Sequence, residues 1–404
     1  MRGDPWRWRW PIPTPLVSAH RPWRTDRLVT RTAQHHSMRA IARLVVVGLA
    51  LPVALELSAR AEDFVRFGVP ITSQVSGVGE LSVVDSQGVH GRPGASYRHF
   101  RINTLGFRGP EERTDSLAMS AVVIATGSSE TFGLYESPEH EWPRIAQRLL
   151  ASSCADQRVT VLNAATAGMS QPWVSVDLQN RLAALHPRLL VYYLQPTQYL
   201  WDQVPTVRYP AKPGAGDQPA FASRVAFRLR TEIKDATPGW LLDALRRRDT
   251  EASRSSGAVP FDGFPRERLD SLDRHLGALI ADAKRRAIPL ALVIPYHRFG
   301  DTISTSVDER QWMNAWERQV PKASGHLLMQ FTDSAVARIR NAARDSGVAL
   351  VDAAFPQSRQ RAQYFADPVH FSDAGAAVVA DSVARVTIDL LGCRQASSRS
   401  LHLR

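Results

Sequence analysis

From residue 121 onward, short apolar runs alternate with amphipathic stretches, and this alternation restricts the folds that the chain can adopt. The apolar runs predict strands at 121–126, 158–163, 188–194, 289–294 and 347–351. The stretches between and after them predict helices at 139–152, 171–185, 266–287, 333–346 and 373–391. Strands that alternate with helices are typical of a parallel sheet with helices on both faces. The sequence therefore predicts an α/β fold with five parallel strands.

The first predicted strand, 121–126, is followed by Gly127 and a turn of small residues. Ser129 stands where this strand gives way to a loop and a helix. Open α/β sheets place their chemistry at that edge, outside the carboxyl ends of the strands. A serine hydroxyl there is a candidate nucleophile if a base takes its proton. The alternative is a turn residue or a helix cap.

The candidate base lies far downstream, in the segment 367–370 (DPVH). His370 can accept the serine proton, and Asp367 can fix the tautomer of the imidazole. The backbone N–H groups of Ser129 and Gly168 are candidate donors to an oxyanion, because glycine lets the main chain approach a substrate closely. Each residue alone also has an ordinary structural interpretation, but their order and their positions at strand ends predict a Ser-His-Asp centre.

The net charge of +11 raises the question of nucleic-acid binding. The basic residues are nearly all arginines scattered along the chain, without a dense tract that also carries aromatic residues. We therefore expect no nucleic-acid partner. No spacing typical of a metal site is found, and the glycines at 214 and 216 do not lie between a strand and a helix, as a phosphate loop requires. We expect neither a metal nor a cofactor.

The first 61 residues are predicted to be separate from the folded domain. Residues 1–37 are interpreted as disordered, or as a misassigned extension upstream of Met38. Residues 38–61 carry two arginines and then an apolar run at 44–55, which has the length of a signal-peptide core. Ala59-Arg60-Ala61 resembles a cleavage site. The alternative is a membrane anchor over 41–59, and both interpretations predict export.

Three further segments complete the domain plan. Residues 62–118 are rich in glycine and short β-like runs, which predicts a small β-rich extension. Residues 200–264 interrupt the α/β rhythm and are interpreted as an insertion over the strand ends, with a helix near 240–247. Residues 299–330 are expected to be irregular. The tail 394–404 is expected to be flexible.

The two cysteines, Cys154 and Cys393, each close a predicted helix. In an exported protein they can form one disulfide, whereas two unrelated thiols are equally compatible with the sequence.

Several segments resemble the sequence blocks of the SGNH (GDSL-type) hydrolase superfamily. They are 127–133 (GSSETFG), Gly168 and 367–375 (DPVHFSDAG), within a resemblance that covers about 121–391. The turn-rich segment 103–110 is similar to one that precedes the first block in exported bacterial members. The resemblance implies a three-layer α/β/α flavodoxin-like sandwich. It also implies an esterase, a lipase, a carbohydrate O-acetyl esterase or an acyltransferase.

By position, the resemblance implies Ser129 as nucleophile, His370 as base, Asp367 as its partner and Gly168 as an oxyanion donor. Two departures stand out. Ser128 replaces the aspartate that usually precedes the nucleophile. The block that normally supplies an asparagine donor has Pro196 and Thr197 here, followed and preceded by glutamines. Since an amide N–H is chemically equivalent, Gln195 or Gln198 is the expected substitute; loss of one oxyanion donor costs about 10²–10³ in rate.

Two downstream residues are candidate substrate contacts. His297 follows the fourth predicted strand and is expected either to face the same cleft or to lie in a surface loop. Trp312 and Trp316 share a helix face, so they either stack on a sugar ring or pack in the core.

The expected function is an exported, serine-dependent ester hydrolase that removes a small acyl group such as acetyl from a cell-envelope or extracellular polysaccharide. Its location would be the periplasm or cell envelope, or the inner membrane through the apolar segment. The alternatives are an O-acyltransferase with the same centre and a catalytically inactive relative that binds polysaccharide or assists its assembly.

Overall fold

The computed structural model describes residues 26–67, 71–72, 77–201, 223–238, 241, 244–245, 248, 260–300, 307–356 and 359–393. The chain divides into two compact units, Met1–Leu57 and Ser58–Arg404. The second unit holds the sheet, the helices that cover it and the candidate site.

A five-stranded parallel sheet forms the centre of the second unit, which confirms the predicted fold class. Its strands are β5 (Ala121–Gly127), β6 (Val159–Asn163), β7 (Leu189–Tyr193), β8 (Leu290–Val293) and β9 (Ala349–Val351). They are hydrogen-bonded in the order β6-β5-β7-β8-β9, and every pair is parallel. The chain leaves β5 towards β6 and then crosses back to β7, so the order reverses beside β5. Such a reversal opens a crevice at the carboxyl ends of the strands.

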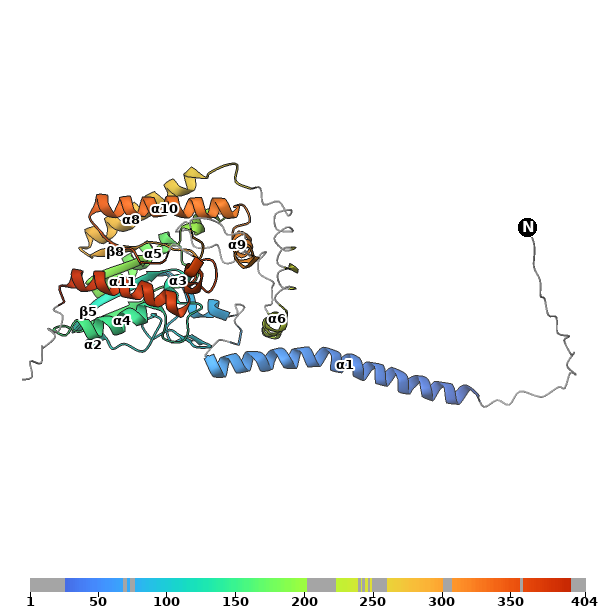
Figure 1. The fold of residues 1–404 in the computed structure, drawn as a ribbon. Helices are drawn as coiled ribbons and strands as arrows, with labels where there is room; N and C mark the ends of the chain where they lie inside the picture. The colour runs from blue at the N-terminus through green and yellow to red at the C-terminus, as the bar shows by residue number, and fades with distance from the viewer. Residues whose placement is uncertain are drawn as a thin grey trace, which may run out of the picture. The chain divides into compact units, whose positions relative to one another are not determined.

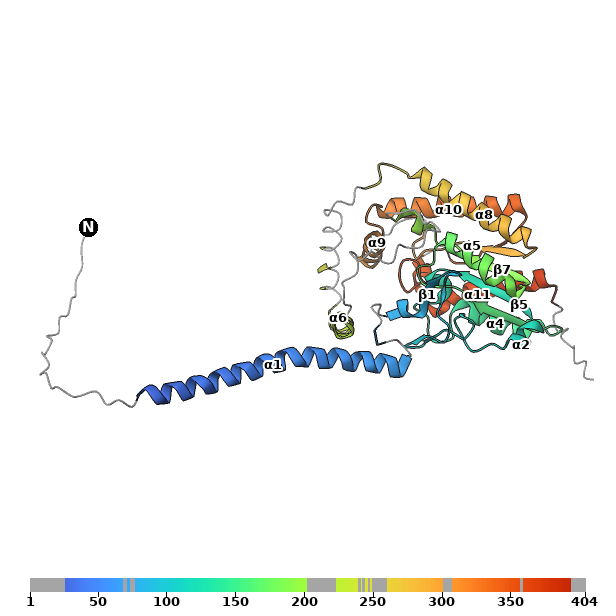
Figure 2. The same cartoon turned by 180° about the vertical axis from the view of Figure 1, so that it is seen from behind.

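Helices cover both faces of the sheet (Figures 1 and 2). One layer holds α4 (Trp142–Ser153) and α11 (Asp373–Leu391). The other holds α5 (Gln171–Asn180), α8 (Arg266–Arg285) and α10 (Gly325–Ser346). The leucine stripe of α8 is buried as its spacing predicts, because one helix face meets the sheet.

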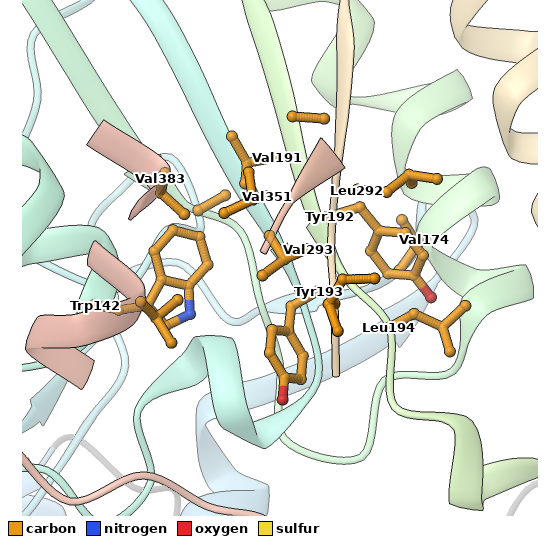
Figure 3. Packing of buried hydrophobic residues seen from close by; sticks show 14 of the residues in the cluster. Trp142, Val174, Val191, Tyr192, Tyr193, Leu194, Leu292, Val293, Val351 and Val383 are labelled. Carbon is orange, nitrogen blue, oxygen red and sulfur yellow. The ribbon is translucent and has the colours of Figure 1, made fainter. Parts of the chain in front are cut away.

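The main core lies between these layers and the sheet. Trp142 of α4 lies near Val383 of α11 on one face, and Val174 of α5 lies near Tyr192 on the other (Figure 3). Because both faces are covered, the strands are mostly apolar rather than alternating between apolar and polar residues.

The β-rich extension is present before the sheet. It contains η1 (Gly77–Leu81), β1 (Ser82–Asp85), β2 (Gly88–Gly91), β3 (Ser96–Tyr97), β4 (Phe100–Arg101) and α2 (Thr114–Ala118), and its strands form two antiparallel pairs. In the turn 103–110, the backbone N–H of Arg108 donates to the carbonyl oxygen of Asn163 at 2.9 Å. The turn therefore meets the end of β6 at the sheet edge.

Two predictions about the helices need correction. The stretch 299–330 is not irregular throughout, since it contains α9 (Val307–Gln319) and the first turns of α10. The helix predicted to begin at 333 begins at Gly325, because the Ser324 side chain accepts a hydrogen bond from Leu327 N and caps it. The insertion 200–264 holds α6 (Arg224–Ala236); of the helix expected at 240–247, the described residues 241, 244 and 245 are helical.

Helix α1 (Asp26–Phe67) contains the apolar N-terminal run. Its segment Arg43–Arg66 is long and apolar enough to cross a membrane, with a mean hydropathy of 1.8. Residues 26–37, expected to be disordered, are the first part of this helix, and 1–25 lie outside the described residues. So does the tail 394–404.

A disulfide joins Cys154 to Cys393 across 239 residues. It links the ends of α4 and α11, which pack side by side. Of the two possibilities left open by the sequence, a disulfide and two separate thiols, the structure has the disulfide. Disulfides persist in oxidising compartments, in line with the expected export.

Candidate active site

Ser129 lies directly beyond β5, as the first residue of the short helix α3 (Ser129–Phe132). Gly127 makes this sharp turn with a φ of 151°, and a Cβ there would lie 2.7 Å from both Thr131 Oγ1 and the carbonyl oxygen of Tyr193. The close approach of strand and helix therefore needs glycine. It leaves the Ser129 hydroxyl half-buried at the carboxyl end of the sheet.

The structure brings Ser129, His370 and Asp367 into one hydrogen-bonded row. Ser129 Oγ lies 2.8 Å from His370 Nε2, and His370 Nδ1 lies 2.7 Å from Asp367 Oδ2. The other carboxylate oxygen, Oδ1, accepts the backbone N–H groups of Val369 and His370 at 2.9 and 2.8 Å. These backbone bonds hold the carboxylate in place, so it fixes both the tautomer and the orientation of the imidazole.

The electrostatics of the row favour a protonated imidazole. Burial by itself lowers the pKa of His370, but the hydrogen bond that its ring donates to Asp367 and the negative charges of Glu130 and Asp367 outweigh it and raise that pKa above 6.5. Burial by itself raises the pKa of Asp367, and the bonds from His370 and Val369 reverse this and lower it. The arrangement therefore stabilises the imidazolium that would form if His370 took the proton of Ser129.

The loop after α3 covers the histidine. The Tyr135 ring lies 5.0 Å from the His370 ring, measured between centroids, and Tyr135 is 54% exposed. The loop is tied to α11, since the backbone N–H of Ser137 donates to Asp373 Oδ1 at 2.7 Å. It is also tied to the turn 103–110, since Arg108 Nη1 donates to the carbonyl oxygen of Gly133 at 2.5 Å. It thus limits access of water to the imidazole.

Glu136, in the same loop, is 2% exposed. Its Oε2 accepts the backbone N–H of Tyr135, whereas Oε1 has no hydrogen-bond partner among the described residues. Burial raises the pKa of Glu136 to about 8. The carboxyl group is therefore mostly neutral at pH 7, because it is costly to bury an ionised carboxylate that has only one of its oxygens hydrogen-bonded.

Two of the expected oxyanion donors, Gly168 and Gln198, converge on Ser128. The backbone N–H of Gly168 and the side-chain amide of Gln198 both donate to Ser128 Oγ, each at 3.2 Å. Gln198 Nε2 also donates to the carbonyl oxygen of Met169 at 3.1 Å. Both hydrogens of this amide are thereby engaged, so Gln198 contacts the site through Ser128 rather than directly.

Gln195 lies elsewhere. Its amide donates to Glu130 Oε1 at 2.5 Å, and its own oxygen accepts the backbone N–H of Thr197 at 3.4 Å. The Gln195 amide thus contacts Glu130, and its part in an oxyanion hole stays a prediction. The reason for this contact is the buried Glu130 carboxylate, which is a stronger acceptor than a neutral group.

The segment that holds His297 is tied to the 367–370 segment, since the backbone N–H of Arg298 donates to the carbonyl oxygen of Pro368 at 2.8 Å. His297 is 6% exposed, with burial and the nearby Arg361 lowering its pKa to about 3. It lines a cavity with Tyr296 and Arg340. Trp312, on α9, is half-buried under the Arg298 guanidinium, 5.0 Å from its ring centroid.

Trp316 packs in the core, 1% exposed and stacked on Phe299 at 5.6 Å. Within the described part of the chain, no group of three or more His, Cys, Asp or Glu side chains is arranged to hold a metal ion.

Sequence reasoning missed the roles of Ser128, Tyr135 and Glu136. For Ser128, the available signal is that it replaces the acidic residue that usually precedes the nucleophile. Tyr135 and Glu136 carry no local signal, because only the fold of the loop brings them to His370.

Comparison with known proteins supplies structural neighbours only. No protein-family model and no curated protein matches the chain. An acetyl xylan esterase (AlAXEase) is 14% identical over 66% of this chain and 100% of its own, at a TM-score of 0.37. The acetylxylan esterase Axe2 from Geobacillus stearothermophilus is 12% identical over 70% and 99%, also at 0.37. A G-D-S-L family protein from Desulfitobacterium hafniense DCB-2 is 12% identical over 66% and 99%, at 0.36.

At these identities and TM-scores, the case for any activity rests on the chain's own side chains. The solved structures similar to this chain include acetyl xylan esterases and a G-D-S-L family protein.

Proposed function

We propose that this protein is a serine-dependent carboxylic ester hydrolase with Ser129 as nucleophile. The observation that carries the proposal is the continuous hydrogen-bonded row from Ser129 Oγ through the His370 imidazole to Asp367. A structural serine needs no base, and a structural histidine needs no carboxylate that is itself held by two backbone N–H groups. The intact row also speaks against the catalytically inactive alternative.

The geometry supports a two-step reaction. Ser129 Oγ attacks the ester carbonyl carbon while His370 Nε2 takes the hydroxyl proton. The tetrahedral intermediate collapses, the carbon–oxygen bond to the alcohol breaks, and His370 gives its proton to the leaving oxygen. Water, deprotonated by His370, then attacks the acyl-enzyme, which releases the carboxylic acid and restores Ser129.

We further propose that the Ser128 hydroxyl donates to the oxyanion in place of the missing asparagine. A hydroxyl has two lone pairs and one hydrogen. The Gly168 and Gln198 N–H groups occupy the lone-pair side of Ser128 Oγ, so the hydroxyl hydrogen is left to donate. The two N–H groups that donate to Ser128 Oγ polarise its O–H bond, which makes the hydroxyl a stronger hydrogen-bond donor. The backbone N–H of Ser129, which has no acceptor within α3, is the second donor.

The substrate that we propose is a small acyl ester, such as an acetyl ester, on a cell-envelope or extracellular polysaccharide. The membrane-length segment of α1 and the disulfide support a location outside the cytoplasm. An acyltransferase would use the same acyl-enzyme with a sugar hydroxyl in place of water, and product analysis with added polysaccharide distinguishes the two.

The test is hydrolysis of p-nitrophenyl acetate by the full chain and its variants. Ser129→Ala and His370→Ala are each expected to lower kcat by about 10⁴-fold or more. The exposed residues Ser152 and His326 supply the matched controls Ser152→Ala and His326→Ala, which are expected to retain full activity. A fluorophosphonate probe is expected to label Ser129. Hydrolysis that persists in Ser129→Ala would overturn the proposal.

A further inference from the structure

The helix that carries Ser129 is a single turn, so its position depends on contacts from outside it. Helix α3 spans only Ser129–Phe132, and one helical turn is not stable by itself in water. The backbone N–H groups of Phe132 and Gly133 donate to the carbonyl oxygens of Ser128 and Ser129, both at 2.9 Å. The carbonyl oxygens that follow, at the end of α3, are left for other parts of the protein to bind.

Two side chains from outside α3 bind carbonyl oxygens at its end. Arg108 Nη1 donates to the carbonyl oxygen of Gly133 at 2.5 Å, and Asn163 Nδ2 donates to that of Thr131 at 3.0 Å. These two residues are themselves joined, since the backbone N–H of Arg108 donates to the carbonyl oxygen of Asn163 at 2.9 Å. The turn 103–110 and the end of β6 thus hold α3 together, from one point at the sheet edge.

The Arg108 side chain fills its space with the geometry of a planar fork. The residue is 6% exposed, and its guanidinium carbon lies 4.9 Å from the ring centroid of Phe100 and 4.8 Å from that of Phe132. Nη2 lies 3.4 Å from Glu141 Oε2, and the Glu141 side chain is buried as well. Arginine can stack between two rings while it donates to two acceptors, whereas the compact ammonium of lysine cannot.

The loop 133–141, which covers His370, packs against the same guanidinium. Gly133 has a φ of 80°, and a Cβ there would lie 2.6 Å from Arg108 Nη1 and 2.3 Å from Glu141 Cβ. No side chain fits at Gly133, so the loop closes directly onto Arg108. Arg108 therefore contacts both the helix that carries the nucleophile and the loop over the base.

We propose that Arg108 is a positioning residue that holds Ser129 and the loop over His370 in the geometry that proton transfer needs. The proposal rests on the esterase function proposed above, because the row that Arg108 keeps aligned is the row from Ser129 to His370. Arg108 acts through Gly133 and α3. A displacement of about 1 Å, caused by a change away from the reacting atoms, can lower the rate about 10²-fold. The β-rich extension, through its turn 103–110, thus takes part in the reaction.

The test compares Arg108→Met and Arg108→Lys in the full chain. Methionine donates no hydrogen bond, so kcat for p-nitrophenyl acetate is expected to fall by about 10²-fold with KM nearly unchanged. Lysine keeps the charge but cannot donate to Gly133 and Glu141 from one planar fork, so its kcat is expected to lie between those of Arg108→Met and the wild type. Arg113→Met, at an exposed arginine of the same extension, is the control and is expected to keep full activity.

Backbone hydrogen exchange separates positioning from a general loss of stability, and it does not depend on the esterase function. In Arg108→Met, the amides of 129–141 are expected to exchange several-fold faster, with those of β5, β6 and β7 as in the wild type. Faster exchange throughout the sheet would show that Arg108 only stabilises the fold, and would overturn the proposal. An unchanged kcat in Arg108→Met would overturn it as well.

The two proposals fail in different ways. Hydrolysis that persists in Ser129→Ala would overturn the esterase function and with it the role of Arg108 in the reaction. If hydrolysis is lost in Ser129→Ala while exchange at 129–141 stays at the wild-type rate in Arg108→Met, the esterase function stands and the positioning role of Arg108 is overturned.

Discussion

Ser129 and His370 are 241 residues apart in the chain, yet Oγ and Nε2 lie 2.8 Å apart in the structure. One residue follows β5 and the other precedes α11, and β5 occupies the position in the sheet where the strand order reverses. Ser129 lies just after the end of β5 and His370 lies just before the start of α11, so no long flexible side chain is needed to close the distance. A site mounted on such rigid elements keeps its reacting groups in register.

The Asp367→Asn variant is expected to lower kcat by about 10⁴-fold with little change in fold, because an amide no longer fixes the imidazole tautomer. Since a neutral imidazole is the active base, kcat/KM of the wild type is expected to fall as pH drops through the raised pKa of His370, which lies above 6.5. Loss of the carboxylate is expected to move this limb to lower pH. An unchanged pH profile in Asp367→Asn would show that Asp367 does not set the pKa of His370.

The Ser128→Ala variant separates two interpretations of the oxyanion site. If the Ser128 hydroxyl donates to the oxyanion, kcat is expected to fall by about 10²-fold with KM nearly unchanged. If the hydroxyl merely occupies the Gly168 and Gln198 donors, its removal would free them, and kcat would stay level or rise. Steady-state kinetics on p-nitrophenyl acetate distinguishes these outcomes, with Ser152→Ala as the control for a serine outside the site.

The Glu136→Gln variant is expected to change how stability depends on pH. The folded protein holds the Glu136 proton up to about pH 8, whereas the unfolded chain releases it near 4.5. The folded state therefore binds more protons in this window, and its stability falls as pH rises from about 4.5 to 8. Glutamine has no proton to lose, so the Tm of Glu136→Gln relative to wild type is expected to rise across that window and level off above it.

The exposed Glu139, in the same loop, provides the control for Glu136. The Tm of Glu139→Gln is expected to run parallel to that of the wild type from pH 5 to 9. Parallel curves for Glu136→Gln as well would show that Glu136 is not held protonated.

Removal of the disulfide by Cys154→Ser with Cys393→Ser is expected to lower the free energy of unfolding by about 2–4 kcal/mol, since the bond closes a loop of 239 residues. Urea unfolding with and without reductant measures the effect. Reductant is expected to destabilise the wild type and to leave the double variant unchanged. Equal unfolding midpoints for the oxidised wild type and the variant would contradict the expected contribution.

Most of the fold was predictable because its signals are local. The apolar runs that form β5 to β9 and the leucine stripe of α8 are patterns within one element, and burial follows from them directly. The correct meeting of Ser129 with His370 also follows from a general rule, because the carboxyl ends of parallel strands gather at one sheet edge. Helix α9 was not predicted as a helix, and its Trp316 packs on Phe299, a contact that depends on the fold rather than on the local sequence pattern.

The sequence by itself therefore determined the sheet, the meeting of Ser129 with His370 at one sheet edge, and an apolar segment long enough to cross a membrane. The tertiary structure decided which glutamine contacts Ser128, that Cys154 pairs with Cys393, and that Arg108 donates to the end of α3. The physical reason is that strand and helix patterns depend on neighbours along the chain. A hydrogen bond, a disulfide or an ion pair depends on which side chains meet within a few ångströms after the elements have packed.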